Sequence, residues 1–383
     1  MLRLAWIITT FSLFLYSFTQ IDLGLTLTRL SCWQGIQRKF QYIGYFNRPL
    51  STAFYLGILF FLFGFYFLIL KAVRERRFTS KQLWQLILTT VVILWFSYNA
   101  FSYDLFNYIF DARIITIYHQ DPYQHKALDF PDDPMLGFMH WTHRLYPYGP
   151  LWLAFTVPLS FLGWQKLVPT MILFKGLAVV GYLGSSWFIY KILEKINPKT
   201  KLVSLTIFAL NPLVIIESLV SAHNDIFMMM LVLGGFWFWL KKRPILAWLM
   251  LFLSVGIKFA TGLLLPIFLL ITFYQWQKRK INWGRIWLVS FGLMIGALLM
   301  ATGRTELQPW YLLWVLPFVA LQAENRFFTW LTISFSLGCL LRYAPFLYYG
   351  HWNPPVPTIK LWLTILPVGL GFIGYLIEKY AAR

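Results

Sequence analysis

Residues 102–150 read SYDLFNYIFDARIITIYHQDPYQHKALDFPDDPMLGFMHWTHRLYPYGP, a long polar stretch in an otherwise apolar chain. The stretch holds six of the chain's 14 acidic residues and four of its six histidines. Ionisable side chains are costly to place next to lipid, so a concentration of them on an apolar scaffold indicates a functional site. This stretch therefore separates the apolar segments before and after it, and it is the first candidate for a functional site.

The composition is that of a membrane protein. Of 383 residues, 59% are hydrophobic and only 12% are charged, and the mean hydropathy is +0.62. Soluble domains carry about 25% charged residues. The net charge of +19 does not indicate a nucleic-acid partner, because the basic residues lie in short clusters between apolar runs, as the positive-inside rule requires. Cys32 and Cys339 are too few for a disulfide framework.

We expect an all-α, polytopic transmembrane bundle of about 12 spans with one large external loop. The expected helices cover residues 4–19, 52–70, 83–101, 168–190, 202–220, 226–240, 245–257, 260–273, 286–301, 311–321, 328–344 and 361–377. The first run has no small-residue cleavage site after it, so we expect a retained helix rather than a signal peptide. The whole chain, 1–383, is expected to be one transmembrane domain, with residues 102–150 as its external catalytic loop.

The basic clusters orient these helices. Residues 71–81, 191–201, 241–243 and 278–285 all fall on one side if both termini are cytoplasmic. Residues 20–48, with four basic residues, break this rule. Residues 151–164 are apolar but short, and a crossing there would move the 191–201 cluster outside. We therefore interpret them as a re-entrant or interfacial helix. Several polar stretches then share the external face: residues 102–150, 221–225, 258, 303–309 and 348–358.

Three further motifs accompany the polar stretch. They are ALNPLVIIESLVSAHNDIFMMM at 209–230, LFLSVGIKFATGLLLP at 251–266 and RTELQPWYLLWVLPF at 304–318. In this order, the set resembles the GT-C superfamily of membrane glycosyltransferases. It is most similar to bacterial polyprenol-phosphate-mannose-dependent mannosyltransferases, including the glycosylphosphatidylinositol mannosyltransferase I type. The resemblance runs from about residue 83 to about residue 318.

The resemblance implies an inverting hexosyltransferase that moves a sugar, mannose in this family, from a polyprenyl-phosphate sugar to an acceptor on the external membrane face. It also implies that Asp104 is the general base. The family often has a second acid two residues after the first, and this chain has Asn107 nearby instead. We therefore expect no cofactor and do not favour a divalent cation, although His140 and His143 have a spacing compatible with one.

The residues can also be interpreted without the family. A carboxylate removes the proton of an acceptor hydroxyl, and a departing phosphate needs positive charge where negative charge develops. Lys258 and Arg304 are the candidates for that charge; Lys258 could instead snorkel to the interface. Further expected substrate contacts are His223, Asn224, Asp225, Asp111, Arg113, Tyr146, Tyr148, Gln308 and Trp310. Asn224 or Asp225 could instead cap the helix that follows.

The expected partners are a polyprenyl-phosphate sugar donor, a glycan or glycolipid acceptor and membrane lipid, with no nucleic acid. The expected location is the bacterial inner membrane, with the site facing outside. The alternative functions are a transporter or flippase of lipid-linked sugars, which would show repeats and charges near the midplane, and a non-catalytic membrane scaffold.

Overall fold

Every regular element in the computed structural model, which describes residues 1–381, is helical; within this range there is no strand. The all-α class is therefore confirmed. The α-helices are α1 (Leu2–Ser17), α2 (Ser31–Gln41), α3 (Arg48–Arg74), α4 (Ser80–Trp95), α5 (Asp104–Thr116), α6 (Pro150–Leu162), α7 (Leu167–Ile196), α8 (Lys201–Ala209), α9 (Pro212–Ile215), α10 (Asp225–Leu240), α11 (Pro244–Ile257), α12 (Leu265–Trp276), α13 (Trp283–Arg304), α14 (Leu316–Ala320), α15 (Arg326–Leu341), α16 (Tyr343–Tyr349) and α17 (Val356–Ala381). The shorter 3-10 or π elements are η1 (Phe18–Gln20), η2 (Tyr42–Phe46), η3 (Ala127–Asp129), η4 (Pro134–Gly137), η5 (Ile216–Val220), η6 (Phe259–Leu264) and η7 (Pro309–Trp314).

Seven segments in the described part of the chain are long and apolar enough to cross a membrane, or eight if one bent pair counts as a span. The seven are Leu2–Gln20, Arg48–Arg74, Leu167–Ile196, Phe259–Trp276, Trp283–Arg304, Arg326–Tyr349 and Val356–Tyr380. The expected count of about 12 is higher than length and composition support. A helix needs about 20 residues to cross a bilayer core of about 30 Å.

Five expected spans account for the difference. Residues 83–101 form only the 16-residue α4, which ends at Trp95. Residues 226–240 and 245–257 form the short helices α10 and α11. Residues 311–321 form a 3-10 turn and the five-residue α14. Residues 226–240 and 311–321 are mostly buried in protein, whereas α4 and α11 also expose large apolar side chains, such as Val92 and Ile245. An apolar run therefore does not reveal whether lipid or protein surrounds it.

The fifth expected span, 202–220, is broken in the middle. Leu210 and Asn211 separate α8 from α9, which begins at Pro212, and the chain bends by 55° between the two halves. Proline disfavours helical geometry in the residue before it, and the Asn211 side chain accepts a hydrogen bond from the Leu213 amide, which starts the new helix. The second half ends in the π-helical turn η5. The bend directs residues 216–225 into the centre of the molecule, where all of them are buried.

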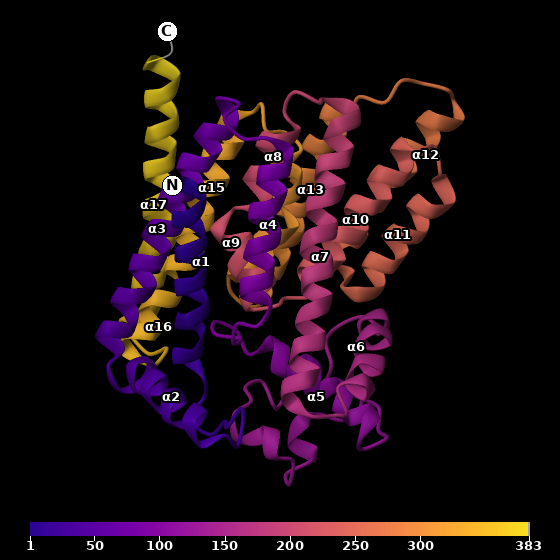
Figure 1. The fold of residues 1–383 in the computed structure, drawn as a ribbon. Helices are drawn as coiled ribbons and strands as arrows, with labels where there is room; N and C mark the ends of the chain where they lie inside the picture. The colour runs from indigo at the N-terminus through magenta and orange to yellow at the C-terminus, as the bar shows by residue number, and fades with distance from the viewer. Residues whose placement is uncertain (382–383) are drawn as a thin grey trace.

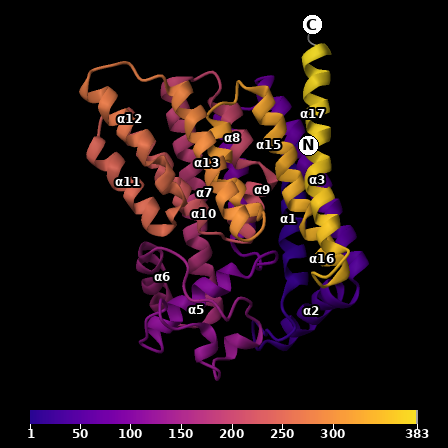
Figure 2. The ribbon, with the colours of Figure 1, turned by 180° about the vertical axis from the view of Figure 1, so that it is seen from behind.

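The elements separate into two layers (Figure 1). Most long helices run side by side, and α2, α5 and α6 lie at one end of them, at the bottom of the view. Seen from behind, the same end carries α2, α5 and α6 (Figure 2). The C-terminal end of α17 and the start of α1 point to the opposite end. At 13 residues, α6 is about 20 Å long, which agrees with a helix that does not cross.

A backbone contact ties the polar stretch to the helices. The Gly149 amide donates to the Ile257 carbonyl at 2.9 Å. A Cβ atom on Gly149 would lie 2.2 Å from the Gly256 carbonyl oxygen, so only glycine allows this approach. The contact holds Tyr148, the preceding residue, beside Lys258 at the end of α11.

Opposite ends of the bundle should be accessible from opposite sides of the membrane. Lys199 and Asp121 are both exposed, one before α8 and the other in the polar stretch. In a Cys32→Ser background, a membrane-impermeant maleimide added to intact cells should label Asp121→Cys but not Lys199→Cys. Permeabilised cells, in which both positions should react, are the control. Labelling of both variants in intact cells would contradict this topology.

Candidate active site

Asp104 lies in the first turn of α5, directly after the irregular segment that follows α4. Local bonds fix this start. The Asn99 amide donates to the Ser102 carbonyl, and the Ser102 hydroxyl accepts from the Asp104 amide at 3.2 Å. A carboxylate at a helix N-terminus is favoured by the helix dipole. The Asp104 side chain is 15% exposed, so it is sheltered but reachable.

A row of three ionisable groups extends from Asp104 into the protein. The His223 Nδ1 atom lies 3.5 Å from Asp104 Oδ2, and its Nε2 atom lies 3.2 Å from Glu217 Oε2. The Tyr343 hydroxyl donates to the other Glu217 oxygen at 3.0 Å. The His223 ring is fully buried and stacks on Trp310, with centroids 4.1 Å apart. The row therefore joins α5, the broken span and α16.

The row favours a charged imidazole. Burial lowers the pKa of His223, but the carboxylates of Asp104 and Glu217 outweigh burial and raise its pKa to about 9. At neutral pH, His223 therefore carries a positive charge between two negative ones. A buried charge needs such partners to be tolerated.

The turn that presents His223 is strained and incompletely bonded. Ala222 has φ of 55°, a left-handed conformation that residues with a Cβ atom seldom adopt. Strain of this kind concentrates at functional sites. Beside the row, buried polar atoms with no hydrogen-bond partner in the described part of the chain also gather here, on Ser218, Ser221, Asn224 and Asp225. Such atoms in one place indicate a region that a ligand or water completes.

A buried lysine braces the same region. The Lys175 ammonium, on α7, donates to the Ser97 carbonyl at 2.6 Å and to the Val220 carbonyl at 3.4 Å. Ser97 leads toward Asp104, and Val220 leads toward His223. One side chain thus ties together the two segments that carry the row.

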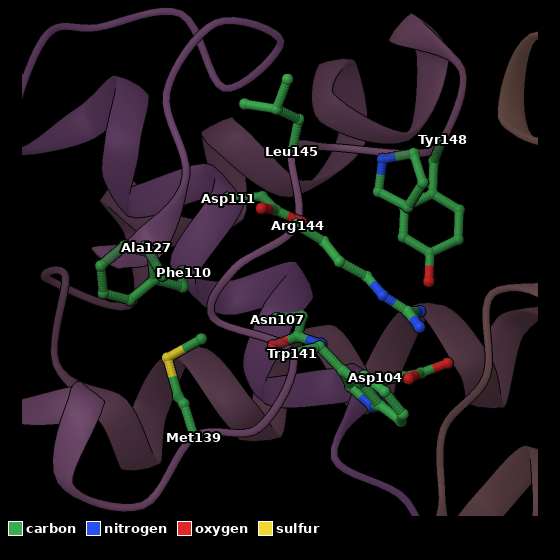
Figure 3. Close-up of a pocket in the computed structure, with 11 residues that line it drawn as sticks. Asp104, Asn107, Phe110, Asp111, Ala127, Met139, Trp141, Arg144, Leu145 and Tyr148 are labelled. Carbon is green, nitrogen blue, oxygen red and sulfur yellow. The ribbon is translucent and has the colours of Figure 1, made fainter. Parts of the chain in front are cut away.

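Asp104 borders two cavities. The smaller cavity, about 50 Å³, is lined by three residues of one α5 face: Asp104, Asn107 and Asp111. They share that face because residues three, four or seven apart lie above one another on a helix. Figure 3 shows the Arg144 side chain extending toward Tyr148 and Asp104 from the opposite wall. The face thus carries a second acid, Asp111, two turns after the first.

Asp111, the second acid of this face, lies in an environment that disfavours its charged form. Burial, together with the Asp104 carboxylate, raises the pKa of Asp111 well above its ordinary range. The protonated form of Asp111 is therefore favoured compared with that of an exposed aspartate.

The larger cavity, about 440 Å³, lies on the other side of Asp104. Segments far apart in the sequence form its wall, and their charged residues are Asp22, Arg48, Asp104, Glu306, Arg342 and Lys360. Aromatic side chains fill much of the remaining surface, including Phe101, Trp141, Trp310, Tyr343, Phe346 and Trp352. This combination of aromatic faces and a few charges is typical of a small-molecule site.

Lys258 occupies an aromatic box beside the row. Its ammonium lies 2.8 Å from Asp225 Oδ1, and the Trp314 indole nitrogen donates to the same oxygen. The rings of Tyr148, Tyr311 and Trp314 lie within 6.0 Å of the ammonium. The charge of Lys258 is therefore balanced by Asp225. Asn224 precedes α10 as expected, but its side chain makes no capping bond.

The other expected residues fall into two groups. Gln308 and Trp310 line the larger cavity, and Tyr148 lines the smaller one. Arg113 and Tyr146 line neither. Arg113 pairs with Asp133 at 2.6 Å, and the Tyr146 hydroxyl donates to the Gly149 carbonyl at 3.0 Å.

Arg304 lies at the C-terminal end of α13, is exposed and lines neither cavity. His140 lines the larger cavity and packs on Tyr103. Among residues 1–381, no three His, Cys, Asp or Glu side chains are grouped as a metal-binding set.

Sequence reasoning missed several residues of the larger cavity. These residues are Arg48, Arg342 and Lys360. Arg342 contacts Glu306, at 3.4 Å, and Thr364. One signal was available: Arg48 belongs to the basic segment 20–48 that breaks the positive-inside rule, and a misplaced charge near lipid indicates function.

Comparisons with known proteins agree with the resemblance drawn from the motifs. Residues 10–274 match the family described as alpha-(1->6)-mannopyranosyltransferase, N-terminal domain. Alpha-(1->6)-mannopyranosyltransferase A of Corynebacterium glutamicum is 27% identical over 177 residues, which are 46% of this chain and 36% of the relative. The match thus spans little more than a third of that relative's length. No solved structure matches. Because the family match covers well over half of the chain and includes both Asp104 and His223, the chain belongs to the alpha-(1->6)-mannopyranosyltransferase family.

Proposed function

We propose that the protein is an inverting glycosyltransferase that transfers mannose from a polyprenyl-phosphate donor to a hydroxyl of a glycan or glycolipid. The observation that carries the proposal is Asp104, a sheltered carboxylate between two cavities, paired with His223 in a chain of a mannosyltransferase family. We place the site at the external face of the bacterial inner membrane, because the basic clusters gather at the other end.

The reaction needs a base that takes the proton of the acceptor hydroxyl, and positive charge near the phosphate that leaves. Asp104 takes the proton of the acceptor hydroxyl as its oxygen bonds to the anomeric carbon. The bond from that carbon to the phosphate oxygen breaks, and the electron pair stays on the phosphate. Attack opposite to the departing phosphate inverts the configuration, so a single carboxylate suffices. No step requires a metal ion or an organic cofactor.

The groups around Asp104 hold the base in place and contact the sugar. The positive His223 holds the Asp104 carboxylate in place without taking up its acceptor lone pairs on the cavity side. Asp111, whose raised pKa favours the protonated form, can donate a hydrogen bond to a sugar oxygen, as can Arg144. The faces of Trp141 and Trp310 offer apolar surfaces for a sugar ring. These roles account for the mixture of polar and aromatic side chains that line both cavities.

The geometry distinguishes transfer from transport. Asp104, Asn107 and Asp111 belong to α5, which lies at one end of the long helices (Figure 1). A transporter would instead place them at the interface of two repeats near the midplane. A scaffold has no need for a base between two cavities. The proposed enzyme accounts for both features.

Asp104→Asn keeps the shape of the side chain but removes its basicity. Mannosyl transfer by the purified protein, measured with a polyprenyl-phosphate mannose, should fall by about 10²–10⁴-fold, the range of lost general-base catalysis. Donor binding should remain. Asp132→Asn, which changes an exposed aspartate of the same segment, is the matched control and should keep full activity. Near wild-type turnover in Asp104→Asn would rule out this base.

The charge on His223 should make stability depend on pH. The pKa of His223 in the folded protein, about 9, is above its ordinary value of 6.5. Its stabilising contribution is therefore fully present below pH 6.5 and is lost as the pH rises through 9. The unfolding temperature of the wild type in detergent should fall over this interval.

His223→Gln should show a smaller fall over the same interval, because the titrating group is gone. His143→Gln, an exposed histidine of the polar stretch, should follow the wild type. Equal pH slopes in the wild type and in His223→Gln would show that His223 is not charged between its two carboxylates.

A further inference from the structure

Two buried cations on the wall of the larger cavity share a single carboxylate. Lys360 Nζ lies 3.0 and 2.9 Å from the two Glu306 oxygens, and an Arg342 nitrogen lies 3.4 Å from one of them. The side chains of Lys360 and Arg342 are 10% and 9% exposed, whereas Glu306 is 51% exposed. The cations are thus built into the wall, and their counter-ion comes from the surface.

The charges of this cluster do not balance. Two positive groups face one negative group in this cluster. The other carboxylates of the cavity wall lie outside it: Asp104 pairs with His223, and in the described residues neither Asp104 nor Asp22 forms an ion pair with Lys360 or Arg342. A surplus positive charge in a sheltered place next to lipid is costly. A second negative charge, supplied by a ligand, would remove that cost.

Arg342 and Lys360 are held in place by contacts in a packed region of helices, whereas Glu306 lies in a connection between helices. Arg342 is fixed by the Thr364 hydroxyl at 3.1 Å, and Lys360 lies over the Trp352 ring at 4.5 Å. Both belong to the packed region of α15, α16 and α17. Glu306 lies in the short connection between α13 and η7. The carboxylate can therefore leave while the cations stay.

The position of the cluster specifies a lipid-linked anion. Lys360 lies in the second turn of α17. Only 11% of the most apolar part of this helix is buried within the protein. Large apolar side chains that follow Lys360 in the same helix are exposed, including Leu361, Ile365 and Leu366. A ligand with a hydrocarbon chain can thus lie along α17 while its charged end reaches Lys360.

We infer that Glu306 is a built-in substitute for the phosphate of a lipid-linked ligand, and that the phosphate displaces it from Lys360 and Arg342. This inference rests on the proposed function and adds a competing group to it. A donor phosphodiester carries one negative charge, and the released polyprenyl phosphate carries up to two at neutral pH, because its second pKa is about 6. The two cations therefore match the phosphate best after transfer, which is where charge develops.

The inference differs from the expectation for Lys258 and Arg304. Lys258 already has a buried partner in Asp225, and Arg304 lines neither cavity. Lys360 and Arg342 border the same cavity as Asp104, so a phosphate on them and a hydroxyl on Asp104 can share one ligand space.

The test is equilibrium binding of a radiolabelled polyprenyl monophosphate to the purified full-length protein in detergent. Glu306→Gln should tighten binding by about 10-fold, because a charged competitor is removed. Lys360→Met should weaken binding by about 10-fold, and Lys360→Arg should restore most of it. Glu75→Gln, which changes a carboxylate paired with an arginine outside both cavities, is the matched control and should have no effect.

Three comparisons identify the ligand. The neutral polyprenol should bind equally to all variants, because it has no charge to exchange for Glu306. Tighter binding of the polyprenyl phosphate by Glu306→Gln identifies the donor side as the source of the phosphate. Tighter binding of phosphatidic acid instead identifies a phosphate-bearing diacyl lipid. Either result supports the inference.

The failures are distinguishable. If the wild type binds polyprenyl phosphate but Glu306→Gln does not tighten it, the substitute role is overturned and the proposed function stands. If the wild type binds no lipid phosphate, the polyprenyl-phosphate donor of the proposed function fails as well. Monodisperse elution of each variant excludes misfolding as the cause of weaker binding, and Lys360→Arg retains the charge if Lys360→Met is unstable.

Discussion

The structure depends on an imidazole held between two carboxylates. His223 joins Asp104 on α5 to Glu217 on the broken span, and both partners lie within 3.5 Å of its ring nitrogens. Each of these groups alone would be expensive to bury. Together they form a row in which every charge has an opposite neighbour. The bend at Pro212, the strained turn at Ala222 and the brace from Lys175 all serve to bring this row together.

The need to pair each buried charge with an opposite one also governs the residues around the row. Lys258 has Asp225, and Arg113 has Asp133, so these cations are balanced within the protein. Lys360 and Arg342 have only Glu306 between them. In a region of low dielectric, the field of an unpaired charge is only weakly screened, so the charge attracts an opposite charge strongly. The unbalanced pair is therefore where an incoming anion gains most.

Parts of this arrangement could be predicted from the sequence. The helical class follows from apolar runs. Asp104 stands at the start of the long polar stretch, and His223 stands in a short polar segment between apolar runs. The number of spans could not be predicted, because α10 and the residues near Glu217 are as apolar as lipid-facing helices while being buried in protein. The pairing of Arg342 with Glu306 could not be predicted either. It depends on the spatial approach of residues 36 positions apart, and nothing in the local pattern specifies it.

The wall of the larger cavity has a consequence for biosynthesis. Its lining runs from Gln20 to Lys360, so it draws on both ends of the chain. Contacts between such distant segments form late, because closing a long loop costs entropy before any contact repays it. A nascent chain that has already inserted Asp104 therefore still lacks His223 and the wall that α17 supplies. The wall of the larger cavity is complete only once α17 has packed against the helices that precede it.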